Sequence, residues 1–426
     1  MRPMQDKEFF TKLFQAAVEA ADPERTIAAH LPPKPKGRTI VIGAGKGSAQ
    51  MTSAFEKAWA AKHGDTPLEG LVVTRYGFGA PCKHIEIIEA SHPVPDAAGL
   101  VASKRLLEIV SGLTEDDLVV ALISGGGSAL LPSPPQGMTL EDEITVNKML
   151  LASGAPIAAM NAVRKHLSTI KGGRLAAAAH PARVYSLIVS DIPGDNPAFV
   201  ASGPTVTDET TREDALKIVE RYSLDLPAAA LAHLHSANAD APKPSDAVFA
   251  GHEYHVIASA GVSLEAAAKA ARNLGVEAVI LSDAIEGEAR EVAHVHAAMA
   301  KQVLAKDQPF KKPVVILSGG ETTVTVRGKG KGGRNSEFLL SLAIDIDGAD
   351  GITAFAADTD GIDGSEDNAG AFADSTSIPR LFAKGQDASA LLNKNDAWTA
   401  FVAIDDLFVP GPTGTNVNDL RAILIR

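Results

Sequence analysis

The segment Gly328–Glu337 carries the residue types that bind anions. It reads Gly-Lys-Gly-Lys-Gly-Gly-Arg-Asn-Ser-Glu and runs directly into an apolar stretch over residues 338–344. Glycine allows backbone N–H groups to approach a ligand closely, and a helix that begins here would add unpaired N–H groups and a positive dipole end. Lys329, Lys331 and Arg334 bring positive charge to the same place. The segment predicts a site for phosphate oxygens or a carboxylate; the alternative is a solvated basic hairpin.

An acidic glycine loop follows this basic one. Residues 358–364 read Asp-Thr-Asp-Gly-Ile-Asp-Gly, and the spacing does not fit an EF-hand because the later ligands are missing. Asp358 stands at the end of a predicted strand and is our candidate metal ligand. Asp360 and Asp363 are expected to cap the turn. Anion-binding and carboxylate-bearing loops in succession indicate a phosphate ester that binds with a divalent cation.

A third glycine loop follows the first predicted strand, over residues 39–42. It reads Gly43-Ala-Gly-Lys-Gly-Ser48 and does not fit a Walker loop. As a dinucleotide fingerprint it lacks a third glycine or alanine, and the next strand ends in Arg75 rather than in an acidic residue. Arg75 could still read the 2′-phosphate of NADP. We interpret Lys46 as a cation that faces a bound anion, with an exposed loop lysine as the alternative.

Two more glycine clusters stand at the ends of predicted strands. Ser124-Gly-Gly-Gly-Ser128 follows a strand over 118–123, and Ser318-Gly-Gly-Glu321 follows one over 314–317. Ligands of open α/β sheets bind at such carboxyl ends, and a run of glycines costs more chain entropy than a simple turn needs. We therefore predict that backbone N–H groups of both clusters cradle phosphate. The cradle residues are Gly125, Gly126, Gly127, Ser128, Gly319 and Gly320, with Glu321 as an added carboxylate.

Two further side chains stand close to predicted strands. Asp191 follows a strand over 184–190, where it could hold magnesium or orient a hydroxyl group. Asp195, four residues later, is expected only to form the turn. His92 lies in the proline-rich loop Ser91-His-Pro-Val-Pro-Asp96 and is a candidate substrate contact. No serine or cysteine has a local pattern typical of a hydrolase triad.

The composition restricts the class of protein. A chain of 426 residues is too long for one ordinary core and predicts two or three domains. The net charge of −12 means that the molecule as a whole repels nucleic acid and anionic membranes. Its cations are concentrated locally in the glycine loops, and this distribution suits a small anionic metabolite as the ligand. No stretch approaches ~18 uninterrupted apolar residues, and no secretory signal pattern is present. The single cysteine, Cys82, fits a reducing cytoplasm. The sequence does not decide the oligomeric state, and a homodimer is one possibility.

The order of patterns along the chain predicts an α/β fold with mostly parallel sheets. Apolar strand-like runs alternate with helical patterns from end to end. Thr139, followed by Asp142 three residues later, predicts a capping box at the start of one helix. Residues 223–244 are rich in alanine and proline and lack periodicity, so we predict an N-terminal domain over 1–240 and a C-terminal domain over 241–426.

Taken together, these motifs resemble those of the glycerate 2-kinase family, in which a glycerate kinase N-terminal domain is joined to a MOFRL domain. The match covers nearly the whole chain. Beyond the loops above, it rests on Ser190-Asp-Ile-Pro-Gly-Asp195, Ser202-Gly-Pro-Thr205, Gly332-Gly-Arg-Asn335 and Gly411-Pro-Thr-Gly-Thr-Asn-Val-Asn-Asp419. Ser336 and Ser91 replace an expected glutamine and glycine, which concerns substrate fit rather than chemistry.

The resemblance implies an ATP- and magnesium-dependent kinase that makes 2-phosphoglycerate from D-glycerate. It implies a Rossmann-like N-terminal domain, a smaller MOFRL-type C-terminal domain and an active site in the cleft between them. The proposed catalytic cations of the family fall on Lys46 and Arg334. The implied small-molecule partners are D-glycerate and ATP with Mg²⁺; no nucleic acid or membrane partner is expected.

The residues give this chemistry a physical basis, because phosphoryl transfer relies on positioning and charge neutralisation. We expect Lys46 and Arg334 to neutralise the moving phosphoryl group and to orient the glycerate carboxylate, beside His92. The predicted metal ligands are Asp191, Glu321 and Asp358. Asp191 is also the candidate for the group that accepts the hydroxyl proton.

The sequence leaves two alternative functions open. The first is a hydroxypyruvate reductase, a label that members of this family often carry, which would bind NADH or NADPH at the Gly43 loop. The missing acidic residue after the second strand counts against it. The second is a metabolite sensor without turnover, and the presence of both Lys46 and Arg334 counts against that.

Overall fold

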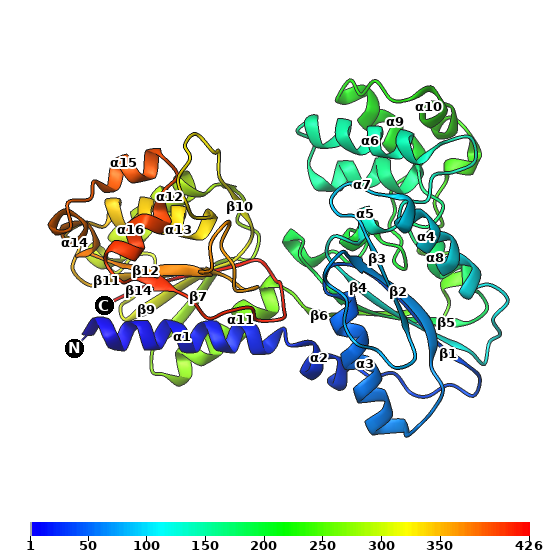
Figure 1. Ribbon diagram of the computed structural model, residues 1–426, viewed down its shortest axis with the longest axis horizontal. Coiled ribbons are helices and arrows are strands. Elements are labelled where there is room, and N and C mark those ends of the chain that lie inside the picture. The colour runs from blue at the N-terminus through cyan, green and yellow to red at the C-terminus, as the bar shows by residue number, and fades with distance from the viewer. Residues whose placement is uncertain (1) are drawn as a thin grey trace. The chain divides into compact units, whose positions relative to one another are not determined.

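The computed structural model describes residues 2–426 and divides into two compact units. The N-terminal unit is Pro23–Ile257, and the C-terminal unit joins the chain up to Asp22 with Ala258–Arg426. The expected boundary at residue 240 is therefore displaced. One reason is that β6 (Glu253–Ala258) completes the sheet of the N-terminal unit. The other is that α1 (Arg2–Ala20) packs on α11 (Ala260–Asn273), so the first helix belongs to the second unit (Figure 1).

The sheet of the N-terminal unit has the strand order β3-β2-β1-β4-β5-β6. Neighbouring strands from β3 to β5 run parallel, which confirms the prediction for this unit. The order reverses between β1 and β4, and doubly wound sheets bind their ligands at this point. Besides β6, the strands are β1 (Thr39–Ala44), β2 (Glu69–Arg75), β3 (Glu86–Ala90), β4 (Leu118–Ser124) and β5 (Arg183–Val189).

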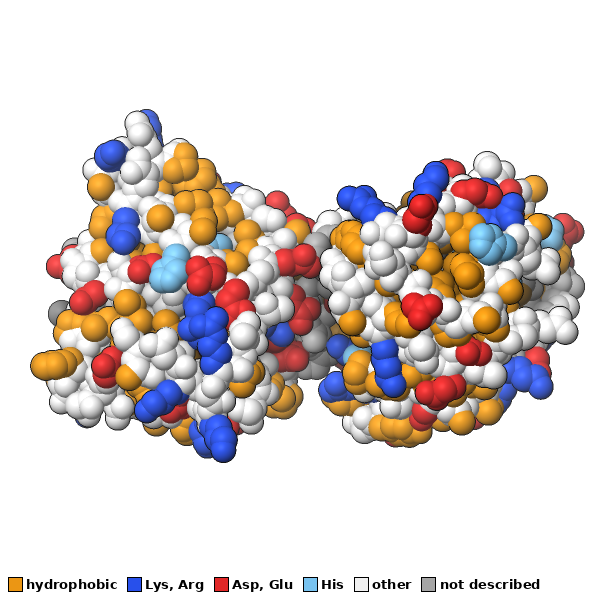
Figure 2. Space-filling model, turned by 90° about the horizontal axis from the view of Figure 1, so that it is seen from above, with side chains coloured by type: hydrophobic (Ala, Val, Ile, Leu, Met, Phe, Trp, Pro, Cys, Tyr) orange, Lys and Arg blue, Asp and Glu red, His pale blue; other side chains and the backbone are white. Residues whose placement is uncertain are grey.

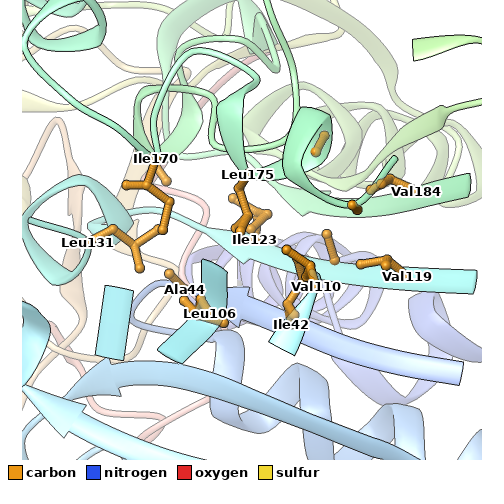
Figure 3. Close-up of a cluster of buried hydrophobic side chains, with 14 of the residues drawn as sticks. Ile42, Ala44, Leu106, Val110, Val119, Ile123, Leu131, Ile170, Leu175 and Val184 are labelled. Carbon is orange, nitrogen blue, oxygen red and sulfur yellow. The ribbon is translucent and has the colours of Figure 1, made fainter. Parts of the chain in front are cut away.

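Two cores cover the two faces of this sheet. Because successive side chains of a strand point to opposite faces, Ile40 and Ile42 of β1 share a core with Leu106, whereas Val41 shares another with Phe55. Figure 3 shows the first of these cores. The helices of the unit are α2 (Pro23–Ala29), α3 (Ser48–His63), α4 (Ala97–Ile109), α5 (Gly127–Leu130), α6 (Leu140–Ala152), α7 (Ile157–His166), α8 (Arg174–Ala178), α9 (Arg212–Arg221) and α10 (Ala228–Leu234). The capping box of α6 is present as predicted.

The main sheet of the C-terminal unit has the order β13-β12-β11-β14-β9-β7. Only β7 and β9 pair in parallel, so the prediction of a mostly parallel sheet is wrong here. The physical reason is the connections: the loop 359–369 joins β11 to β12 without a crossover helix, and the chain end inserts between β11 and β9. The strands are β7 (Glu277–Ser282), β9 (Val314–Ser318), β11 (Ile352–Asp358), β12 (Gly370–Asp374), β13 (Leu407–Phe408) and β14 (Asp419–Ile425), with a separate pair of β8 (Gly287–Glu288) and β10 (Thr322–Thr323).

Helix α1 supplies aromatic side chains to the core of the C-terminal unit. Phe10 stacks on Phe355 of β11 with ring centroids 5.8 Å apart, and Phe14 meets Phe408 edge-on at 5.0 Å. Besides α1 and α11, the helices are α12 (Ala289–Lys306), α13 (Arg334–Asp345), α14 (Ser377–Ala383), α15 (Ala388–Asn393) and α16 (Ala397–Ala403). None of the helices described is long and apolar enough to cross a membrane. Figure 2 shows acidic and basic side chains interspersed over the face that it draws.

The packing of α1 generates a stability prediction. Phe10 is 1% exposed, so Phe10→Ala should destabilise the C-terminal unit by about 3–5 kcal/mol through lost burial and a cavity. Phe382, which is 82% exposed, is the matched control, and its replacement by alanine should change stability by no more than about 0.5 kcal/mol. Urea denaturation measures both. Equal midpoints for Phe10→Ala and the parent would contradict the assignment of α1 to this core.

Candidate active site

The carboxyl ends of β1, β4 and β5 bring together the predicted residues of the N-terminal unit. The Lys46 N–H donates to the Gly125 carbonyl at 2.8 Å, which ties the loop after β1 to the loop after β4. A Cβ atom placed on Gly125 would lie 1.8 Å from Oδ2 of Asp191. One placed on Gly126 would lie 3.0 Å from Cε of Lys46 and 3.1 Å from Nε2 of His92. A cation, an imidazole and a carboxylate thus surround the glycine run.

The glycines of these two loops are required by the local backbone. Gly126 has φ +78° and Gly45 has φ +144°, conformations that side chains other than glycine rarely adopt. A Cβ atom on Gly45 would also lie 2.1 Å from Oγ of Ser124. That hydroxyl oxygen accepts a hydrogen bond from the Gly47 N–H at 3.0 Å. Ser124 therefore holds the two loops in register, a role that the sequence did not reveal.

His92 is a neutral imidazole in this cluster. Burial, and then the positive charges of Lys46 and Arg75, lower the pKa of His92 to about 4. At neutral pH one ring nitrogen donates a hydrogen bond and the other accepts one. His92 therefore suits a hydroxyl group of a ligand better than an anionic group.

The Ser128 side chain is already engaged within the protein. Its Oγ lies 2.9 Å from Oγ of Ser202, which in turn donates to Oδ1 of Asn161 at 2.8 Å. The sequence alone indicated no role for Ser202 or Asn161. The sequence gives little indication of these contacts, because they join chain segments that lie far apart in the sequence.

In the C-terminal unit, Arg334 is bound by three carboxylates. Its Nη1 donates to Glu321 at 3.0 Å, its Nη2 to Asp358 at 2.6 Å and its Nε to Asp419 at 2.8 Å. The sequence singled out Glu321 and Asp358 but gave no role to Asp419, which is buried at the start of β14. A usable signal for Asp419 was its position: the last glycine-rich motif ends there and the final apolar run begins.

The charges of this cluster do not balance. Burial lowers the pKa of Arg334, but Asp419, Asp358 and Glu321 outweigh it and raise that pKa above its ordinary value. Burial raises the pKa of Asp358, the guanidinium of Arg334 opposes this, and Asp419 adds to the rise. Arg421, which is fully buried, also donates to Asp419. Burial also raises the pKa of nearby Asp363, so a further cation would favour the ionised forms of Asp358 and Asp363.

The donor chemistry of this cluster suits magnesium only in part. Carboxylate oxygens are its preferred protein ligands, but Glu321 and Asp358 already accept from Arg334, and Asp191 belongs to the other unit. Residues 2–426 contain no group of three or more His, Cys, Asp or Glu side chains placed to hold a metal ion. The residues present fit one or two bonds to an ion rather than a complete cage.

Several N–H groups of the basic glycine loop are bonded within the protein, which narrows the first expectation from the sequence. The Gly328 N–H donates to Oδ1 of Asn395 at 3.0 Å, and the Lys331 N–H donates to Oδ1 of Asp396 at 3.0 Å. A Cβ atom on Gly328 would lie 2.1 Å from the carbonyl oxygen of Lys394. These glycines therefore allow the loop to pack closely against residues 394–396. The same glycine pattern serves backbone packing here and ligand approach elsewhere, so sequence alone did not separate the two.

The start of α13 is likewise filled by the protein. The buried carboxylate of Asp363 accepts from the N–H groups of Asn335 at 2.9 Å and Ser336 at 2.8 Å, and from the Ser336 hydroxyl at 2.5 Å. Asp363 is thus a cap, as expected, although it caps a helix rather than its own turn. Its negative charge occupies the positive end of the helix dipole, so the expected anion site there is absent among the described residues. Arg334 remains as the contribution of this segment.

The second predicted phosphate cradle is also wrong in part. The Gly319 N–H donates to the Ser282 carbonyl at 2.8 Å and is therefore committed to the sheet. Gly320 has φ +102°, and a Cβ atom there would lie 2.3 Å from the backbone nitrogen of Ile285. The Gly320 carbonyl accepts from the Asp419 N–H at 3.2 Å. Gly319 therefore has no free N–H group for phosphate, and both glycines position the acidic cluster, whereas phosphate binding by Gly320 stays a prediction.

Comparisons with known proteins match two family models to this chain, one mainly over the N-terminal unit and one within the C-terminal unit. The model described as "Domain of unknown function (DUF4147)" matches residues 9–235, and that of the MOFRL family matches residues 314–419. The D-glycerate 2-kinase of Thermotoga maritima is 39% identical over 98% of both chains. The chain belongs to the glycerate 2-kinase family. A crystal structure of a glycerate kinase from Thermotoga maritima matches with a TM-score of 0.89 and 38% identity over 100% of each chain.

Other relatives in this part of the glycerate 2-kinase family carry a different name. A protein of Agrobacterium vitis called putative hydroxypyruvate reductase is 53% identical over 98% of this chain and 94% of its own. In this member of the family, β2 ends at Arg75, whose guanidinium lies over the Phe78 ring at 3.4 Å from its centroid. The last residue of that strand is therefore a cation rather than the acidic residue that binds a ribose in a dinucleotide fold.

The neutral state of His92 predicts a pH dependence of stability. The pKa of His92 is 6.5 in the unfolded chain and about 4 in the folded protein, so the folded protein binds this proton only at lower pH. The unfolded state then binds more protons, so this residue makes the free energy of unfolding fall as the pH falls from 6.5 to about 4. His92→Gln should lose less stability over that window than the parent. Denaturation midpoints across the window measure this, with His84→Gln, an exposed histidine, as the control. If His92→Gln lost as much stability as the parent protein over this pH window, the assignment of a neutral His92 would be contradicted.

Proposed function

We propose that this protein is a kinase that transfers the γ-phosphate of ATP to D-glycerate, giving 2-phosphoglycerate and ADP. The observation that carries the proposal is the guanidinium of Arg334, fixed by Glu321, Asp358 and Asp419. A planar cation held in one orientation suits the oxygens of a phosphoryl group in transit. The likeness over the full chain to a D-glycerate 2-kinase supports the same substrate.

Each unit contributes different groups to this reaction. Lys46 supplies a mobile ammonium for the glycerate carboxylate and the phosphoryl group, and neutral His92 supplies hydrogen bonds to hydroxyl groups. Asp191 lies against the same glycine run and accepts the proton of the attacking hydroxyl. The N–H groups of Gly125, Gly126 and Gly127 are assigned to phosphate oxygens. Arg334 acts from the C-terminal unit.

Magnesium that arrives with ATP would neutralise charge on its phosphates. Glu321 and Asp358 are the residues of the C-terminal unit that would hold it. Asp191 of the N-terminal unit is the alternative ligand, and it would hold the ion in place of its role as proton acceptor. The surplus of carboxylates over guanidinium groups around Arg334 supports a cation there. Because both carboxylates already bond to Arg334, the ion would share them with it.

A single plate assay tests the proposed function. One set of wells holds D-glycerate with Mg-ATP and reports ADP, and the other holds hydroxypyruvate with NADH or NADPH and reports absorbance. We expect ADP release that depends on glycerate, with constant nicotinamide absorbance. Nicotinamide oxidation without ADP would support the reductase named among the relatives and overturn the kinase. ATP binding without turnover in either set would point to a sensor.

The two proposed catalytic cations generate a kinetic prediction. Lys46→Ala and Arg334→Ala should each lower kcat by at least about a hundredfold, because each removes charge stabilisation of the transition state. Arg334→Lys keeps the charge but loses the planar fork, so it should not restore the rate. Lys329→Ala, at an exposed position of the same loop, is the control and should keep the parental rate. Turnover of Arg334→Ala within about tenfold of the parent, ~1.4 kcal/mol, would make the role untenable.

A further inference from the structure

A chain of three side chains in the N-terminal unit fixes the direction of one hydroxyl proton. Ser128 Oγ lies 2.9 Å from Ser202 Oγ, and Ser202 Oγ lies 2.8 Å from Asn161 Oδ1. Ser202 and Asn161 are each 1% exposed, so water does not compete for these bonds. Ser128 is half-buried at the start of α5, beside the glycine run.

The direction follows from what each group can donate. The Asn161 amide Nδ2 donates to the Phe199 carbonyl at 3.4 Å, which turns its oxygen toward Ser202. An amide oxygen only accepts, so the Ser202 hydroxyl must donate to Asn161. A hydroxyl has one proton, so Ser202 must accept from Ser128. The Ser128 proton therefore points inward, and the remaining lone pair of its oxygen is available only as an acceptor.

We propose that Ser128 is a specificity-determining residue: its oxygen accepts a hydrogen bond from the glycerate hydroxyl that is not phosphorylated. The inference rests on the proposed function and deepens it. Ionised phosphate oxygens only accept hydrogen bonds, so a hydroxyl whose proton points inward cannot bind them. The role of the Ser128 side chain in phosphate binding, expected from the sequence, is replaced by this one. Ser202 and Asn161 are positioning residues.

The backbone conformation around Ser202 fixes the position of this residue beside the glycine run. Ala201 has φ 52° and Ser202 has φ 61°, values in the left-handed region, which non-glycine residues adopt only at a cost in backbone strain. A Cβ atom on Gly127 would lie 2.6 Å from Cβ of Ala201, so the strained turn packs directly on the glycine run. The Gly172 N–H holds the Ser202 carbonyl at 3.1 Å. Strain of this kind persists where the surroundings fix it, often at binding sites.

The neighbouring groups match a small hydroxy acid. Such a ligand presents one anionic group and hydroxyl donors. The cluster offers one ammonium, Lys46, for the anion, and neutral His92 and Ser128 as hydrogen-bond acceptors. ATP presents several anionic groups, and its hydrogen-bond donors are the ribose hydroxyls and the adenine amino group. These donors are the competing partners of Ser128 within the proposed reaction, and the KM for ATP separates them from glycerate.

The test compares Ser128→Ala with the parent in steady-state kinetics of the full-length protein. KM for D-glycerate should rise about five- to tenfold, whereas KM for ATP should stay within about twofold. D-lactate lacks the 3-hydroxyl and so cannot donate a hydrogen bond to Ser128. It should therefore inhibit the parent and Ser128→Ala equally. Ser202→Ala removes the acceptor that orients Ser128 and should raise KM for D-glycerate by a smaller factor. Ser186→Ala is the control: it removes a hydroxyl that is also 1% exposed and donates to Thr205 at 2.8 Å.

The contrary results are distinct. An increase in KM for ATP that disappears with 2′-deoxy-ATP would assign Ser128 to the ribose. Equal weakening of glycerate and D-lactate, or an effect as large in Ser186→Ala, would show a merely structural role. Ser202→Ala with parental kinetics for both substrates would also overturn the proposal. Absence of glycerate-dependent ADP release in the parent would instead overturn the proposed function, and this inference with it.

Discussion

The binding of one guanidinium by three carboxylates organises the C-terminal unit. Glu321 follows β9, Asp358 ends β11 and Asp419 begins β14, so Arg334 ties together the ends of three neighbouring strands. The antiparallel insertion of β14 is what brings Asp419 to this edge. The pairs of Arg334 with the buried Asp358 and Asp419 are costly to break, because the groups left behind stay desolvated. The sheet order and the position of the cation therefore depend on each other.

The two units carry complementary chemistry. The N-terminal cluster combines an ammonium, a neutral imidazole and a hydroxyl oriented as an acceptor, which together suit a hydroxy acid. The C-terminal cluster combines a fixed guanidinium with a surplus of carboxylates, which together suit phosphate accompanied by a divalent cation. The proposed transfer between a nucleotide and a hydroxy acid would use both kinds of chemistry.

The sequence predicted the N-terminal sheet well, because buried apolar runs followed by glycines have few other interpretations; that its carboxyl edge binds the ligand stays a prediction. It misplaced α1, since an amphipathic pattern shows that a helix has an apolar face but not which core covers that face. Gly126 and Gly328 look alike in the sequence, yet one lies beside Lys46 and the other packs on backbone. Asp419 lies 85 residues from its partner, so no local pattern reveals that contact.

The central claim is that a phosphoryl group moves from ATP to glycerate, and ³¹P NMR of the reaction mixture tests it most directly. The purified protein is incubated with D-glycerate and Mg-ATP, and the spectrum is recorded with proton coupling. The account predicts a new phosphomonoester signal split into a doublet, because a phosphate on carbon 2 couples to one neighbouring proton. A triplet would place the phosphate on carbon 3. A spectrum that shows only ATP and its hydrolysis products would contradict the account.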